Sequence, residues 1–154
     1  NSVLEMDTIQ LEGVDSSIRK TSGVVEEGAK LLVRERIMTD GDEIAKTDFD
    51  VTLKGENSSA DLVSRSVAKG NSYQEFTSKM NGEAKCNGHS ECDAILVGNG
   101  KVAAAPALVA SNLDAELIHE AAIGKIAGDQ ILKLQSLGLT KEEAEEKIIS
   151  GFLK

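Results

Sequence analysis

The sequence predicts a mainly β protein: a right-handed parallel β-helix, or solenoid, followed by a C-terminal pair of α-helices. Short stretches of alternating apolar and polar residues, rich in β-branched side chains, run from the N-terminus to about residue 124. Glycines separate these stretches every 12 to 16 residues. Only 3% of the residues are aromatic, so layers of Val, Ile, Leu and Ala must fill the core. This composition favours a solenoid over a sandwich or a barrel.

Strands are expected where the alternation is clearest. In such strands the aliphatic side chains point into the coil, and polar residues take the outward and corner positions. The clearest stretches are Leu31–Ile37, Val51–Leu53, Leu62–Val67 and Ala94–Val97, and the separating glycines are Gly41, Gly55, Gly70, Gly82 and Gly98.

The C-terminal segment changes to the three- and four-residue spacing of helices. This spacing predicts a helix over Asp129–Leu137 that ends at Gly138 in the left-handed conformation. The residues that carry the spacing are Ile126, Gln130, Leu134 and Leu137.

A second helix is expected to begin after Thr140, whose hydroxyl forms a capping box with the carboxylate of Glu143. We also expect an ion pair between Glu143 and Lys147 on the solvent side. The apolar face of this helix comprises Ala144, Ile148 and Phe152. The chain therefore divides into a β-helix core of residues 1–124 and a helical segment of residues 125–154 packed on it, one domain overall.

Composition and charge narrow the classes of function. The 154 residues carry 26 acidic and 17 basic side chains, a formal net charge of −9, which disfavours nucleic-acid binding. No apolar run approaches the roughly 20 residues of a membrane-spanning helix, so we expect no membrane insertion. Two cysteines are too few for a disulfide scaffold, and the absence of a secretory leader at Asn1 agrees with a cytoplasmic protein. The start without Met indicates a segment of a longer protein or a processed one.

Three metal-ligating side chains, Cys86, His89 and Cys92, fall within seven residues. A structural zinc site normally needs four ligands, and only His119 follows, so packed or surface residues are the favoured interpretation. The pair His89-x-Glu91 resembles the start of a zinc deaminase motif, but the Pro-Cys-x-x-Cys that this chemistry needs is missing.

Two other motifs lack an essential part. His119-Glu120 opens like a metalloprotease helix, but Ile123 replaces the second histidine. The Gly-x-Gly at 98–100 resembles a dinucleotide-binding turn, but Pro106 would fall inside the helix that must follow, so a corner of the coil is favoured.

A group of acidic residues supports one alternative function, an acidic β-helix enzyme that acts on polysaccharide with calcium. The group lacks the spacing of an EF-hand loop, and the chain has few aromatic residues to stack on sugars, so a solvated surface is favoured. It comprises Asp40, Asp42, Glu43, Asp48 and Asp50. No nucleophile or phosphate-loop signature is present, and we expect no enzymatic activity.

Taken together, the C-terminal blocks resemble the SufB/SufD family of iron–sulfur cluster assembly proteins. The order and spacing of several blocks agree, which is more specific than any single block, and the likeness is strongest over residues 85–152. The matching blocks are Glu91–Leu96, His119–Ala121, Asp129–Ile131, Gly138–Ala144 and Ile148–Phe152. The resemblance implies a β-helix core with C-terminal helices, as expected above.

The resemblance also implies a function. It implies a scaffold of the SUF system that binds a nascent, labile iron–sulfur cluster and docks a SufC-type ABC ATPase through its helical pair. It implies Cys92, His119 and Glu120 as the residues that hold the cluster, and Glu120 makes the chain more SufB-like. Many members have an aromatic residue and an Arg where this chain has Leu134 and Leu137.

Cluster chemistry makes a dimer reasonable, either of two copies or with a SufB/SufD-type paralogue. Iron–sulfur clusters usually take four thiolate ligands, and one chain offers Cys92, His119 and Glu120 at most. Pairing the open edges of two β-helices would complete the ligand set, so we expect Cys92 at a surface where two copies meet. Successive residues of a strand point to opposite faces, so His119 and Glu120 serve one site only if the chain bends there. A metal-free structural adaptor for the ATPase is the other alternative.

Overall fold

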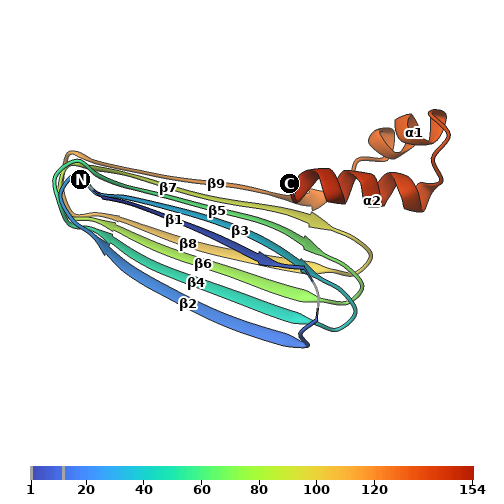
Figure 1. The fold of residues 1–154 in the computed structure, drawn as a ribbon, viewed down its shortest axis with the longest axis horizontal. Helices are drawn as coiled ribbons and strands as arrows, with labels where there is room; N and C mark the ends of the chain where they lie inside the picture. The colour runs from blue at the N-terminus through green and yellow to red at the C-terminus, as the bar shows by residue number, and fades with distance from the viewer. Residues whose placement is uncertain (1, 12) are drawn as a thin grey trace.

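The chain, seen in a computed structural model that describes residues 2–11 and 13–154, winds into two facing parallel sheets. One sheet has the strand order β1-β3-β5-β7-β9 and the other has the order β2-β4-β6-β8. Each coil of the chain therefore adds one strand to each sheet, which is the topology of a β-solenoid (Figure 1). Two helices follow the last strand. The predicted parallel β-helix with a C-terminal helix pair is confirmed.

The elements have the following bounds in the described part of the chain. The first sheet contains β1 (Val3–Gln10), β3 (Lys30–Thr39), β5 (Ser58–Ala68), β7 (Cys86–Leu96) and β9 (Ala115–Lys125). The second sheet contains β2 (Ser16–Val25), β4 (Ile44–Leu53), β6 (Tyr73–Gly82) and β8 (Lys101–Ala110). The helices are α1 (Gly128–Ser136) and α2 (Lys141–Phe152).

Glycines set the coil length at one row of corners. Partner positions in consecutive coils lie 27 to 29 residues apart. Gly41, Gly70 and Gly98 recur at this spacing with φ angles of 57°, 61° and 65°, a region that side chains disfavour. Beside them the amide of Asn99 donates to the side-chain oxygen of Asn71 at 3.1 Å. The corners of successive coils therefore stack. This stacking explains three of the five separating glycines seen in the sequence, Gly41, Gly70 and Gly98.

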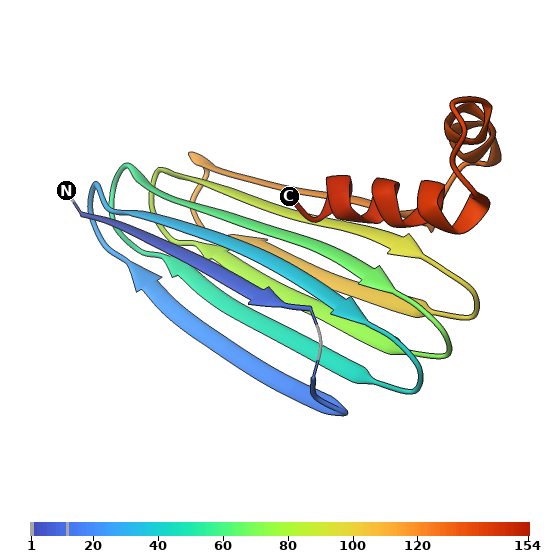
Figure 2. The same ribbon diagram turned by 45° about the vertical axis from the view of Figure 1, so that its right-hand side comes forward.

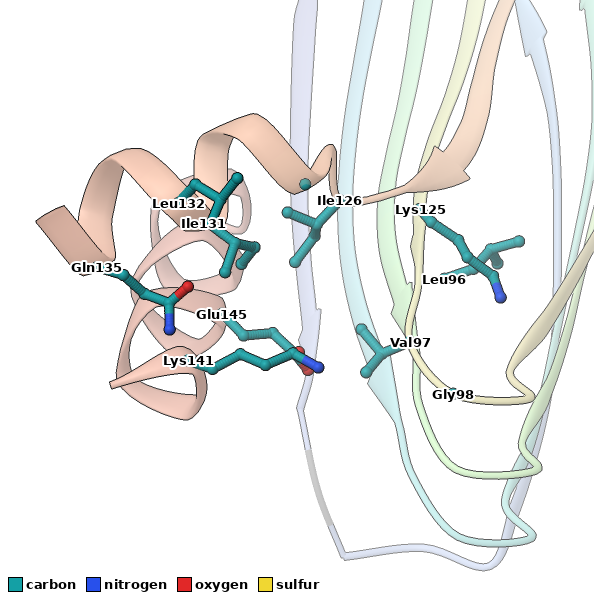
Figure 3. A pocket seen from close by; sticks show the side chains of 11 residues that line it. Leu96, Val97, Gly98, Lys125, Ile126, Ile131, Leu132, Gln135, Lys141 and Glu145 are labelled. Atoms are coloured by element: carbon teal, nitrogen blue, oxygen red, sulfur yellow. The ribbon is translucent and has the colours of Figure 1, made fainter. Parts of the chain in front are cut away.

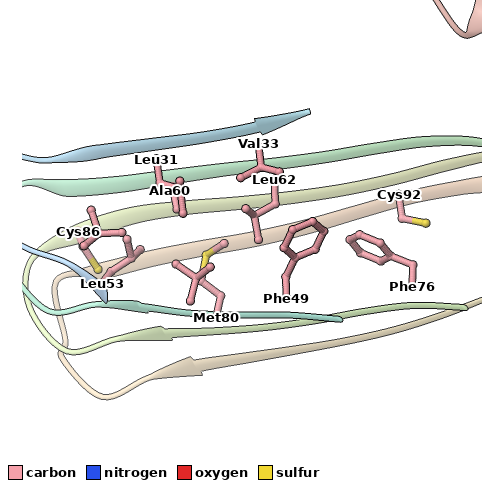
Figure 4. Close-up of a cluster of buried hydrophobic side chains, with 12 residues drawn as sticks. Leu31, Val33, Phe49, Leu53, Ala60, Leu62, Phe76, Met80, Cys86 and Cys92 are labelled. Carbon is pink, nitrogen blue, oxygen red and sulfur yellow. The ribbon is translucent and has the colours of Figure 1, made fainter. Parts of the chain in front are cut away.

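The apolar core lies between the two sheets. Phe49 and Phe76 meet there with ring centroids 6.0 Å apart and planes tilted by 56°. Aliphatic side chains such as Leu62 and Met80, both fully buried, fill the space toward the turns (Figure 4). A solenoid core thus needs few aromatic residues, because each coil contributes a thin layer of side chains.

Polar side chains also lie in the interior, so the expectation that polar residues take the outward and corner positions is wrong for this part of the coil. Glu35 is 2% exposed, forms an ion pair with Arg19, and accepts hydrogen bonds from Thr47 Oγ1 (3.1 Å) and Ser64 Oγ (2.9 Å). Other buried polar side chains with hydrogen-bond partners are Thr39, Ser72, Gln74, Ser78 and Ser90. Burial is tolerated because these groups satisfy one another.

The helix pair follows the predicted signals at its ends. Gly138 adopts a φ of 99° just after α1, and Thr140 and Glu143 form the capping box of α2. The predicted ion pair of Glu143 with Lys147 is not among those formed by the described residues, because the Glu143 carboxylate accepts the backbone N–H of Thr140 at 2.7 Å. Ala144 is fully buried on the predicted apolar face, while Ile148 and Phe152 are half-buried.

Helix α1 lies beyond the end of β9, and α2 runs back alongside the first sheet, so that Lys154 lines a pocket with Arg65 and Glu91 (Figure 2). Between the helices and the corner that joins β7 to β8 lies a hollow of about 430 Å³, whose lining includes Val97, Ile126 and Ile131 (Figure 3). No helix in the described part of the chain is long and apolar enough to cross a membrane.

Candidate functional site

The sequence-predicted site residues lie on two neighbouring strands of one sheet, β7 and β9. These strands pair in parallel, with Ser90 opposite His119 and Glu91 opposite Glu120. Both strands are regular here, so successive side chains alternate between the interior of the solenoid and its outer surface. The predicted residues are therefore divided between an inner and an outer face.

Cys92 lies on the inner face and is 1% exposed. Its side chain points toward Phe76 across the core (Figure 4). Burial raises the pKa of the Cys92 thiol to about 11, and the negative charge of Asp93 adds to the shift. The prediction that this thiol lies at a surface is wrong for the single chain, because β7 turns position 92 inward.

His119 also projects from the inner face, one strand further along the sheet. Its Nδ1 lies 3.2 Å from Ser90 Oγ, and its Nε2 is buried with no hydrogen-bond partner in the described structure. Burial lowers the pKa of His119, and the neighbouring His89 lowers it further. An imidazole nitrogen buried without a partner is costly, so a ligand for it would be stabilising.

Glu120 points the other way, to the outer face. There it meets His89, with 3.3 Å between Glu120 Oε2 and His89 Nε2, and Glu91 is the third member of the group. One ligand atom from each of these three residues lies within 4.8 Å of the other two. On the opposite side of the imidazole, Asp61 Oδ1 lies 2.7 Å from His89 Nδ1. We call His89, Glu91 and Glu120 the outer cluster.

The electrostatics of the outer cluster are those of crowded carboxylates around one imidazole. The hydrogen bond with Asp61 is the main cause that raises the pKa of His89, and Glu120 raises it too. Partial burial raises the pKa of Glu91, followed by the neighbouring Asp93 carboxyl, while Arg65 opposes the shift.

Cys86 lies apart from the outer cluster and also from Cys92 and His119. It lies on the inner face near the turn, 1% exposed, among aliphatic side chains (Figure 4). It is six residues before Cys92 on the same strand, a separation of roughly 20 Å in an extended chain. The three ligands that fall close together in the sequence therefore do not converge.

The sequence did not identify two residues as partners of Glu120 and His89: Asp61, beside the outer cluster, and Glu91, within it. Asp61 is one coil before His89 and lies directly beside it in the register of β5 and β7. Glu91 comes beside Glu120 in the same manner. The spacing of the corner glycines could have predicted these contacts. It gives the coil length, and the coil length determines which residues become neighbours.

The remaining sequence motifs have structural roles. Gly98 and Gly100 form a coil corner, as expected, and a Cβ at position 100 would lie 2.1 Å from Ala68 O. Asp40 and Asp50, from the acidic group once considered for calcium, lie 3.6 and 3.8 Å from Lys69 and Lys79 in surface ion pairs. Among the described residues that acidic group is not one of the metal-type clusters.

Fold and site together define a parallel β-solenoid protein with thiol, imidazole and carboxylate side chains on its last coils. Residues 1–152 match the family described as "SUF system FeS cluster assembly, SufBD core domain". The chain therefore belongs to the SufBD family of iron–sulfur cluster assembly proteins.

Relatives agree with this membership. A protein of Archaeoglobus fulgidus named "Iron-sulfur cluster assembly SufBD family protein" is 34% identical over 131 residues, which cover 84% of this chain and 36% of the relative. A protein of Methanothermobacter thermautotrophicus with the same name is 40% identical over 105 residues, covering 67% of this chain and 26% of the relative. A Pyrococcus horikoshii relative is 42% identical over 106 residues, covering 66% and 31%. The chain thus spans about a quarter to a third of these proteins.

Proposed function

We propose that this chain acts as a scaffold in iron–sulfur cluster assembly, holding a nascent cluster and docking a SufC-type ABC ATPase, with no turnover of its own. Membership of the SufBD family supports the general role. The observation that carries the specific proposal is the buried Nε2 of His119, which has no partner in the described structure and projects on the same inner face as Cys92.

The inner pair, Cys92 and His119, supplies the ligand types that iron–sulfur clusters take. Thiolates are the usual ligands, and an imidazole replaces a thiolate in some clusters. With a pKa of about 11 the Cys92 thiol is neutral at pH 7, so iron must displace a proton in order to bind. This requirement makes binding depend on pH, so that it weakens as the pH falls.

Access to the inner pair requires the last coil to open. This coil is the least packed of the second half of the solenoid: Leu108 on β8 is 38% exposed, whereas its partner Met80 on β6 is fully buried. Pro106 also lies in β8, at the sheet edge, where its missing N–H costs no hydrogen bond. Movement of β8 and β9 away from the core would expose Cys92 to a cluster or to a second subunit.

The edges of β8 and β9 also suit a dimer. Each strand pairs on one side only within the described chain, so both present free backbone groups to another protein. A second copy or a SufB/SufD-type paralogue that pairs there would bring further ligands to the inner pair. A dimer of this kind would complete a set that one chain cannot supply.

The helix pair is the proposed docking surface for the ATPase. Leu132 and Leu137 are 67% and 71% exposed, and α1 has no buried residue. Exposed apolar side chains beside a hollow are typical of a protein interface. We also propose a cytoplasmic location, because two cysteines are too few for a disulfide scaffold and fit a reducing compartment.

Anaerobic reconstitution with ferrous iron and sulfide tests the cluster proposal. The chain should acquire the visible absorbance of sulfur-to-iron charge transfer, and Cys92→Ala should abolish it. Cys86→Ala is the matched control, because Cys86 is equally buried on the same strand. If Cys92→Ala retains as much iron and sulfide as the parent, the assigned ligand is wrong.

Co-purification with the ATPase subunit tests the docking proposal. Leu137→Asp should release the ATPase, whereas Leu113→Asp should not, because Leu113 is fully exposed at the corner before β9, away from the helices. A complex that forms normally while neither the parent nor Cys92→Ala takes up iron would instead identify a metal-free adaptor.

A further inference from the structure

The outer cluster has an excess of negative charge at one point of the sheet. Glu91 and Glu120 occupy the same rung of β7 and β9, and like charges directly opposite one another destabilise a sheet. Asp61 on β5 lies on the rung of His89, two positions before Glu91, and Asp93 lies two positions after it on β7. The positive side chains nearby line a pocket with Glu91 to which His89 and Glu120 do not contribute; they are Arg34, Arg36, Arg65 and Lys154.

The contacts of His89 call for either a second proton on the imidazole or a metal ion. Its Nδ1 lies 2.7 Å from Asp61 Oδ1 and its Nε2 lies 3.3 Å from Glu120 Oε2. A neutral imidazole has one N–H and one lone pair. One of the two contacts would therefore set a lone pair against a carboxylate oxygen, unless a second proton or a metal ion lies between them.

We propose that the outer cluster is a binding site for a first-row divalent metal ion, with His89 Nε2 and the carboxylates of Glu91 and Glu120 as ligands. The nitrogen and oxygen donors suit Zn²⁺, Fe²⁺ and Mn²⁺, and three protein ligands leave positions open for water or another molecule.

The geometry is close to that of a bound ion. Ligand atoms 2.0–2.2 Å from one ion lie roughly 3 to 4 Å from each other, and the three donors here lie within 4.8 Å. Rotation of the exposed Glu120 and half-buried Glu91 side chains would close the difference. Asp61 is a positioning residue: its carboxylate holds the proton on Nδ1, so that the lone pair of Nε2 faces the ion.

This site is distinct from the proposed cluster site. The outer cluster lies on the solvent side of β7 and β9, whereas Cys92 and His119 lie on the inner side of the same strands. The inference therefore stands whether or not a cluster forms on Cys92. It gives Glu120, predicted as a ligand together with Cys92, a separate site.

Isothermal titration of this chain with Zn²⁺ at pH 7.5 tests the site. The parent should bind one ion, and His89→Ala and Glu120→Gln should each weaken binding at least about 10-fold. Asp61→Asn should weaken it by about 10- to 100-fold, the range found for residues that orient metal ligands. Glu116→Gln is the matched control, because Glu116 is exposed on the same face of β9 but outside the cluster.

Two further variants separate this test from that of the cluster. The Cys86→Ala, Cys92→Ala double variant should bind Zn²⁺ as the parent does and fail in cluster reconstitution. Circular dichroism of every variant checks that the strands remain folded. A parent that binds no Zn²⁺, or a His89→Ala variant that binds it equally well, would overturn the proposal and leave His89 as a protonated partner of two carboxylates.

Discussion

The two faces of β7 and β9 carry similar residue types in opposite states. On the inner face burial keeps the Cys92 thiol and the His119 imidazole neutral, by raising the pKa of one and lowering the pKa of the other. On the outer face carboxylates raise the pKa of His89 and favour its charged form. Neighbouring residues of one strand thus differ in the protonation state that their surroundings favour, because they point to opposite faces of the sheet. The face on which a thiol or imidazole lies therefore determines whether its neutral or its charged form is favoured.

Thiol labelling gives the largest contrast between the faces. With a pKa of about 11, Cys92 at pH 8 has about two orders of magnitude less thiolate than an ordinary cysteine. We expect a thiol reagent such as DTNB to modify neither native cysteine until the protein unfolds. Ile118→Cys places a thiol on the outer face of β9 and should react at once. Rapid labelling of the metal-free parent would show that the last coil opens without a partner.

Truncation in the interior should give the next largest effect. Leu62→Ala removes a fully buried side chain and should lower the free energy of unfolding by about 3 kcal/mol. Ile118→Ala, on the outer face of the same sheet and 57% exposed, should change it by less than about 1 kcal/mol. Urea denaturation of both variants measures the difference. Equal losses would contradict the assignment of inner and outer faces.

Removing Arg19 tests the buried charge of the interior. Arg19→Ala leaves the carboxylate of Glu35 without its ionic partner and should cost about 2 kcal/mol, less than for a fully buried pair because Arg19 is partly exposed. Arg36→Ala is the control: its guanidinium lies 3.9 Å from Asp7, which is 55% exposed, and the loss should stay below about 1 kcal/mol. Equal losses of unfolding free energy for the two variants in urea denaturation would show that the buried Glu35 carboxylate does not need Arg19.

The pH dependence of the two histidines should give the smallest effect. In metal-free protein, NMR titration should place the pKa of His89 above and that of His119 below the ordinary value of about 6.5. His89 therefore stabilises the fold below about pH 6.5, and this stabilisation is lost as pH rises through its folded pKa. His119 stabilises the fold above about pH 6.5. This stabilisation is lost as pH falls toward its lowered folded pKa, because the unfolded state binds a proton at this histidine first. Identical titration of both would contradict the two environments.

Much of the fold was predictable because it depends on local rules. Alternation indicated the strands, the small share of aromatic residues favoured a solenoid, and Thr140 with Glu143 marked the start of α2. The buried polar network around Glu35 was not predictable in the same way. Its partners Arg19, Thr47 and Ser64 come from three other strands, and sequence alternation alone does not show that their polar groups meet.

The candidate site was predictable as a set of residues but not as an arrangement. Cys92, His119 and Glu120 were identified from family resemblance, and strand geometry already required His119 and Glu120 to separate. The register of β7 with β9 then paired Ser90 with His119 and Glu91 with Glu120. That register depends on the length of each coil, and an error of one residue would exchange every inner side chain for an outer one.

The sequence by itself determined the class of fold, the helix ends, and the family to which the chain belongs, because each depends on short-range spacing or on recognisable blocks. Only the tertiary structure decided that the Cys92 thiol is buried, that the Nε2 of His119 is buried without a partner in the described structure, and that Glu120 joins His89 and Glu91 outside. The physical reason is that these contacts join residues about one coil apart in the chain, and stacking of the coils alone brings them together.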